Sequence, residues 1–277
     1  MRRLILPAAL VGVIVLLALF APWLGLPDPV RQDVANRLAG PGVAGLLGRD
    51  EFGRDVFSRL IWGARTSLAV AFASALIACT AGTLLGLMSA WFRGLGGMLA
   101  LGSTDIILCF PPVLLALLIV TLLGPGALTL IAVLSVLFIP GFARVTYAEV
   151  QLVQELEYVE AARAIGATTP RILLRTILPN VAGPILVQLS LAVAAAVVLE
   201  SGLSFLGLGV VPPAPSWGLM IRGARTTLEL APLLLLWPCA ALTLTILAMN
   251  LLCDALRDAV DPRTARQPGH RPAPSTP

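Results

Sequence analysis

Six long apolar runs limit the folds open to this chain, because each approaches the length that a helix needs to cross a bilayer, about 20 residues. The runs occupy residues 4–20, 67–88, 106–123, 127–142, 181–199 and 233–252. Of the 277 residues, 58% are hydrophobic and 12% are charged, which is about half the charged fraction of a soluble domain. The sequence therefore predicts an all-α membrane protein with six transmembrane helices.

The first run has the basic start and apolar stretch of a signal peptide, since Arg2 and Arg3 precede it. No A-x-A cleavage site follows Phe20, however. The next residues include Trp23, a residue type that favours the membrane–water interface. We therefore expect this run to remain as the first transmembrane helix.

The residue types exclude several functions. All 19 basic residues are arginine, and the lack of lysine excludes a Walker A loop, whose lysine contacts the nucleotide phosphates. The arginines are scattered, so the net charge of +4 does not indicate nucleic-acid binding. No C-x-x-C pair and no cluster of His, Cys or acidic residues indicates a catalytic or metal site. We expect no enzyme activity, cofactor or metal on this chain, and we interpret the four cysteines as small hydrophobic residues.

The arginines weakly favour a topology with both termini in the cytoplasm. With that orientation, 11 of the 19 arginines lie on the cytoplasmic side and eight lie outside. Cytoplasmic loops carry an excess of basic residues in membrane proteins. Because six of the outer arginines share one loop with five acidic residues, charge alone leaves the opposite topology open.

The connector between the fourth and fifth runs, residues 155–180, has the pattern of two helices joined by an elbow. Its first ten residues favour a short helix with an acidic start, and Gly166 can end that helix in the left-handed conformation. Pro170 can open a second helix over residues 171–178, which Pro179 would end. The pattern fits an interfacial amphipathic connector as well as a docking element for a soluble partner, and by itself leaves both open.

Six residues of the connector match a known motif in register: Glu160, Ala161, Ala162, Gly166, Leu178 and Pro179. They resemble the EAA loop of binding-protein-dependent ABC importer permeases, whose pattern is EAA, three residues, Gly, nine residues and I-x-L-P. The one departure is Thr176 in place of Ile. The resemblance implies a type I importer (MetI-like) permease fold. In that fold the connector is a cytoplasmic coupling helix that sits in a cleft of a separate ATPase subunit.

The same resemblance implies how the chain is divided and what it works with. The permease core would span residues 65–254, and residues 1–64 would hold the first transmembrane helix and an extracytoplasmic loop. Residues 255–277 would be a cytoplasmic tail, which we expect to be disordered because it has almost no apolar residues from Pro262 on. The implied partners are a second homologous permease subunit, two ABC ATPase subunits that bind ATP and Mg, an extracytoplasmic substrate-binding protein and membrane lipid. The chain would lie in a bacterial inner membrane with both termini in the cytoplasm.

Two further segments, residues 48–60 and 201–218, resemble the peptide and nickel branch of these permeases. The first matches L-G-T-D-x-x-G-R-D-x-x-S-R-L except for Arg49, and the second matches S-x-L-S-F-L-G-L-G-x-x-P-P-x-P-x-W-G. Residues 254–262 resemble the closing element of the branch, with Cys253 replacing its Gly. The resemblance implies alternating-access transport of di- or oligopeptides, with nickel or another small solute as the alternative.

These outer segments contain our remaining candidate site residues. Arg54 and Asp55 can form a local charge pair, followed by a short amphipathic helix over residues 56–65. That element is interpreted either as a structural lid or as a contact for the binding protein. The glycine-rich segment is expected either to gate the outer end of the path or simply to pack helices, and its candidate residues are Ser201, Gly202, Gly207 and Gly209.

The polar residues near the apolar runs do not form a substrate cage. Asp105 begins the third run and Glu200 follows the fifth, and we expect both to be solvated at the interface. Gln188 lies within the fifth run, where it can bond across helices. A secondary carrier, the main alternative from another class, often has repeated halves and ionisable groups at the midplane. Neither feature is found in this sequence.

Overall fold

A computed structural model describes residues 2–42, 45–92 and 95–260 of the chain. Within this part, five helices are long and apolar enough to cross a membrane. They are α1 (Arg2–Phe20), α2 (Val56–Trp91), α5 (Ala127–Val153), α8 (Leu178–Leu206) and α10 (Leu233–Val260). The described residues form no β-strand beyond one isolated bridge. The predicted all-α membrane fold is confirmed.

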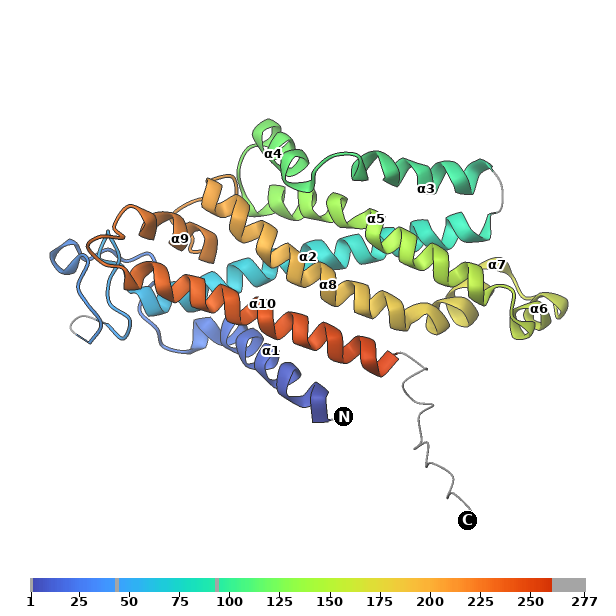
Figure 1. Ribbon diagram of the computed structural model, residues 1–277, viewed down its shortest axis with the longest axis horizontal. Coiled ribbons are helices and arrows are strands. Elements are labelled where there is room, and N and C mark those ends of the chain that lie inside the picture. The colour runs from blue at the N-terminus through green and yellow to red at the C-terminus, as the bar shows by residue number, and fades with distance from the viewer. Residues whose placement is uncertain (1, 43–44, 93–94, 261–277) are drawn as a thin grey trace, which may run out of the picture.

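The long helices run along one axis and give the molecule two ends (Figure 1). The loop of residues 21–55 and the short helix α9 (Trp217–Arg225) lie at one end, which we call the α9 end. The helices α6 (Glu157–Ala164) and α7 (Thr169–Arg171) lie at the opposite end, the α6 end. Helix α1 starts, and α10 finishes, toward the α6 end.

Helices α2 and α5 form the closest packed pair, because glycines allow their backbones to approach. A Cβ atom added at Gly82 would lie 2.6 Å from the carbonyl oxygen of Ile139, and one at Gly86 would lie 2.5 Å from that of Ala143. Small residues at such contacts allow helices to pack by van der Waals contact inside a membrane. Fully buried alanines continue this interface along α2: Ala71, Ala75, Ala78 and Ala90.

The third apolar run, residues 106–123, does not form a single helix. The chain forms α3 (Leu95–Leu108) and α4 (Pro112–Leu123), which are bent by 89° at the break. Two adjacent prolines, Pro111 and Pro112, remove backbone donors, and the ring of each clashes with the preceding turn. The described chain thus has five candidate spans, or six if the bent pair makes one crossing.

Three other helix boundaries differ from the sequence prediction. Helix α2 begins at Val56, so no separate short helix forms over residues 56–65. Helix α5 continues past its apolar run to Val153. Helix α10 continues to Val260, so residues 255–260 are helical, and the rest of the predicted tail lies outside the described residues. Helices extend beyond the apolar runs because local propensity and packing, not hydropathy, determine where they end.

Candidate functional site

The connector at the α6 end contains a hydrogen-bonded turn that requires glycine. Gly166 has φ +77°, and its N–H donates to the carbonyl of Arg163 over 3.0 Å. The next N–H, of Ala167, donates to the carbonyl of Ala162 over 3.1 Å. This pair of bonds is the Schellman motif, which ends helices at a left-handed residue. The structure confirms that Gly166 ends the first helix of the connector.

Buried side chains attach the connector to the rest of the fold. Val159 of α6 is fully buried, and Ile172 and Ile177 pack into the same core. The guanidinium carbon of Arg163 lies 4.5 Å from the ring centre of Trp91, the last residue of α2. Contacts of this kind add a cation–π attraction to apolar packing. The connector is therefore in direct contact with helices that run to the other end of the molecule.

The opposite side of the connector is exposed and mixes apolar with charged groups. Glu160, Ala161, Gly166 and Pro179 are exposed or half-buried at this end, as are Ala162 and Leu178. Ile165, at the elbow, is 84% exposed. Tyr158 and Leu156 are large apolar residues that are also exposed here. An exposed apolar patch with charged neighbours is typical of a protein interaction site.

The second helix of the connector does not end at Pro179, and that prediction is wrong. A π-helical turn over Ile172–Ile177 joins α7 to α8, and the apolar span is continuous over Thr169–Leu206, 38 residues. In this wider turn the N–H of Leu178 donates to the carbonyl of Leu173. The side chain of Asn180 donates to the carbonyl of Thr176 over 2.6 Å. A π-bulge places Pro179 where its missing N–H is tolerated, so one helix runs from the elbow toward the α9 end.

At the α9 end, Arg54 does not pair with Asp55 as predicted. Its Nε lies 2.6 Å from Asp50 Oδ2, and its Nη2 lies 3.3 Å from Glu51 Oε1. Asp55 instead caps α2, since its carboxylate accepts from the N–H of Ser58 over 2.8 Å. A carboxylate at this position satisfies a helix N–H that has no partner inside the helix. Arg54 and Asp55 are adjacent in sequence but interact with different parts of the structure, Arg54 with the loop and Asp55 with the start of α2.

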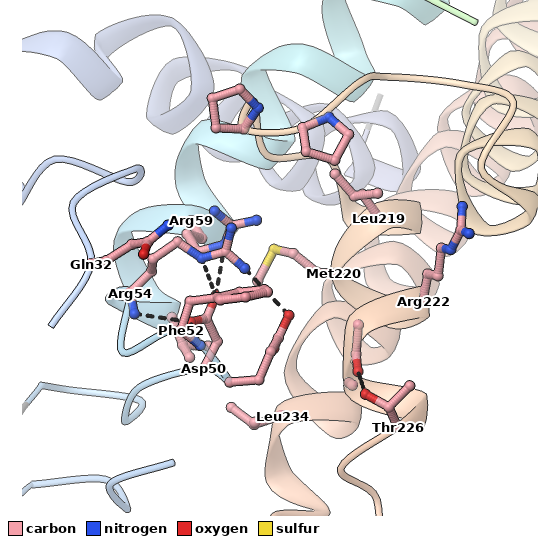
Figure 2. A pocket seen from close by; sticks show the side chains of 16 residues that line it. Gln32, Asp50, Phe52, Arg54, Arg59, Leu219, Met220, Arg222, Thr226 and Leu234 are labelled. Carbon is pink, nitrogen blue, oxygen red and sulfur yellow. Dashed lines mark hydrogen bonds and ion pairs between the residues drawn. The ribbon is translucent and has the colours of Figure 1, made fainter. Parts of the chain in front are cut away.

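A fourth charged residue, Arg59, completes the cluster of Arg54, Asp50 and Glu51 and fixes the loop on α2. Arg59 Nε lies 3.4 Å from Asp50 Oδ2, and its Nη1 donates to the carbonyl of Pro29 over 3.0 Å. Figure 2 shows Arg54 and Arg59 converging on Asp50, across a pocket from Leu219 and Met220. The pocket has a volume of about 440 Å³ and lies between this loop and α9. Sequence reasoning missed Asp50 and Arg59 as partners, because the turn between them brings them together.

Glu200 is fully buried, so its expected solvation at the interface is wrong. Its Oε1 accepts from the hydroxyl of Ser204 over 2.7 Å, and its Oε2 accepts from that of Ser201 over 3.3 Å. Buried polar groups cost free energy unless they are hydrogen-bonded, and these serines supply the bonds. Asp105, the other acid, lies 2.6 Å from Arg144 in an exposed pair that joins α3 to α5.

Two of the three candidate glycines in this segment have close neighbours, one in α9 and one in α8. Gly207 ends α8 with φ +84°, beside the guanidinium of Arg222. A Cβ atom at Gly209 would overlap the hydroxyl of Ser204. A Cβ atom at Gly202, in contrast, would meet nothing within 4 Å. Gly207 and Gly209 therefore have steric reasons to be glycine, and Gly202 has none within the described chain.

Comparison with known proteins identifies the family. Residues 82–266 match the family described as binding-protein-dependent transport system inner membrane component. The chain belongs to this family. It is therefore a permease component of a transport system and a multi-pass inner-membrane protein. The predicted core boundaries, at residues 65 and 254, stay a prediction.

Named relatives extend over most of the chain. The di/tripeptide transport system permease of Pseudomonas aeruginosa is 40% identical over 256 residues, 90% of this chain and 84% of that protein. A glutathione transport system permease of Pectobacterium atrosepticum is 38% identical, over 90% of this chain and 83% of that one. A dipeptide transport system permease of Alkalihalophilus pseudofirmus is also 38% identical, over 92% and 86%.

A solved structure has the same fold. A chain of the MetNI methionine ABC transporter, in an inward-facing conformation, superimposes with a TM-score of 0.60 at 18% identity. The match covers 73% of this chain and 96% of that chain. This likeness, with the family match, confirms the predicted type I importer permease fold.

Proposed function

We propose that this chain is one of two permease subunits of an ABC importer that carries di- or oligopeptides into a bacterial cytoplasm. The observation that carries the proposal is the connector at the α6 end. Its motif residues are exposed or half-buried, and a continuous helix, Thr169–Leu206, follows its exposed elbow. The peptide substrate is supported by the names of three relatives, which are 38–40% identical to this chain.

In the proposed mechanism, two partner ATPase subunits bind ATP and Mg and receive the connector in a cleft. Glu160, Ala161, Ala162, Gly166, Leu178 and Pro179 form or shape the coupling surface. Closure of the ATPases moves this surface. The helix that follows the elbow, Thr169–Leu206, moves with it and changes the side of the membrane to which the transport path is open. The ATPases must contact the connector differently in the two states, or they could not shift the equilibrium between them.

The α9 end would then face the outside, where a binding protein delivers the peptide, and both termini would be cytoplasmic. Arg54 and Asp55 organise the loop that the binding protein contacts. Ser201, Gly202, Gly207 and Gly209 belong to the outer gate, beside the buried Glu200. ATP hydrolysis belongs to the partner subunits and not to this chain.

Uptake in reconstituted vesicles tests the proposal. The chain, its partner permease, the ATPases and the binding protein are placed in proteoliposomes that contain ATP, and uptake of a labelled dipeptide is measured. We expect uptake that requires ATP and stops when the ATPases are omitted. Uptake driven by an ion gradient without ATPases would indicate a secondary carrier. Uptake of nickel but not of peptides would retain the importer and overturn the peptide substrate.

A further inference from the structure

A groove on the membrane-spanning helices contains charged groups that no element of the mechanism above uses. Helices α5 and α10 both pack against α8, and Figure 1 shows α8 between them. The groove over α8 has a volume of about 720 Å³. Pockets for small ligands have volumes of about 300–1,000 Å³, so the groove has room for a short peptide.

Charges of both signs line this groove from opposite walls. Glu149 lies on α5, whereas Asp254 and Arg257 lie on α10. Within the described residues, none of the three forms an ion pair or a side-chain hydrogen bond. All three belong to helices that qualify as membrane spans. Glu149 is half-buried, Asp254 and Arg257 are exposed, and all three lie beyond the apolar runs of residues 127–142 and 233–252. They are therefore accessible to a charged ligand in the groove.

The floor of the groove adds neutral polar contacts and joins it to the connector. Gln188 lines it from α8, where its side-chain nitrogen lies against Gly141 of α5. Asn180 lines its edge, three residues after the π-helical turn that ends at Ile177. The floor therefore belongs to the same continuous helix that starts at the coupling elbow. A movement of the elbow would displace the floor relative to the walls.

We propose that this groove is a transient binding site for the zwitterionic main chain of the transported peptide. Arg257 receives the C-terminal carboxylate, because a guanidinium forms paired charge-assisted hydrogen bonds with a carboxylate. Glu149 and Asp254 receive the N-terminal ammonium, and Gln188 contacts a peptide amide. The groove offers no fixed partner for the side chains of the peptide. The site would therefore recognise the two charged termini and accept peptides of different sequence. The inference rests on the peptide substrate proposed above.

Binding to the assembled transporter without its binding protein tests the groove directly. A labelled dipeptide is titrated into the purified nucleotide-free complex, and the same dipeptide is tested with an amidated C-terminus or an acetylated N-terminus. We expect Arg257→Gln to weaken binding of the free peptide by roughly tenfold or more, because the neutral side chain loses the paired charge-assisted hydrogen bonds to the carboxylate. It should leave the amidated peptide unchanged. Glu149→Gln should reduce the preference for a free N-terminus over an acetylated one.

Matched controls separate this effect from a general loss of charge. Arg37→Gln and Glu229→Gln remove exposed charges outside the groove and should leave all affinities unchanged. ATPase activity of each variant complex verifies that it is assembled. Equal loss for free and amidated peptides, or no loss, would overturn the inference. A variant that changes only the amount of bound anionic lipid, and no peptide affinity, would also overturn the inference.

The uptake assay distinguishes this failure from failure of the proposed function. If the unaltered transporter takes up dipeptides but groove variants bind them normally, the groove site is wrong and the importer stands. If the unaltered transporter takes up no peptide, the proposed substrate is wrong.

Discussion

At the residue scale, ionisable side chains found partners in ways that their order along the chain does not reveal. Arg54 is bonded to Asp50 and Glu51, while its neighbour Asp55 caps a helix. Glu200 was expected in water and lies among serines instead. In each case the partner is presented by a turn or a helix face, since only adjacent surfaces in the fold can pair.

The buried Glu200 makes a stability prediction. Glu200→Ala leaves the hydroxyls of Ser201 and Ser204 without their acceptor and opens a void, so it should lower the free energy of unfolding by roughly 3 kcal/mol. Glu200→Gln keeps the shape and one acceptor oxygen, and should cost less than half as much. Thermal unfolding of the two variants in detergent measures the difference. Equal midpoints for both variants would contradict the role of the serine bonds.

At the scale of elements, two helix features matter most: the close α2–α5 pair and the continuous helix that leaves the connector. The first depends on glycines that face a neighbouring backbone. The second depends on a π-helical turn in front of a proline. Both are local sequence features whose effect is decided by what lies beside them, because steric room is a property of the packed fold.

The α2–α5 pair can be tested with a single methyl group. Gly82→Ala puts a Cβ 2.6 Å from the Ile139 carbonyl and should force the helices apart, lowering the thermal midpoint. Gly102→Ala, in α3, has no neighbour within 4 Å, so it should leave the midpoint unchanged or raise it through helix propensity. If both substitutions act alike, propensity rather than packing explains the effect.

The elbow makes a different prediction, because its glycine is required by conformation and not by space. Gly166 has φ +77°, and a Cβ atom added there would meet nothing within 4 Å. Gly166→Val should therefore strain the turn by about 1–2 kcal/mol, whereas Gly166→Asn, which tolerates this region, should cost less. We expect substrate-stimulated ATPase activity of the complex to fall more in the Val variant. Identical activities would show that the left-handed turn is not needed for coupling.

At the scale of the whole molecule, the two ends have distinct chemistry. The α9 end holds a network of buried ion pairs beside a pocket. The α6 end presents an exposed elbow with a large apolar side chain. Long helices join the two ends.

Exposed apolar residues at the two ends provide a matched test of polarity. Ile165, at the α6 end, is 84% exposed, and Leu230, after α9, is 79% exposed. Ile165→Glu should reduce the amount of ATPase subunit that copurifies with the permease, because it buries a charge in the proposed interface. Leu230→Glu should leave copurification unchanged. Equal loss in both variants would argue against docking at the elbow.

Hydropathy, glycine conformation and motif spacing are local properties, so the membrane class, most helices, the left-handed turn at Gly166 and the family could all be predicted from the sequence. It did not determine the break before Pro112, the continuity of the helix through Pro179, or the partners of Arg54 and Glu200. These features, and the groove between α5 and α10, arise from the packing of the folded chain. Such features depend on which surfaces meet, and residues far apart in sequence meet only when helices pack.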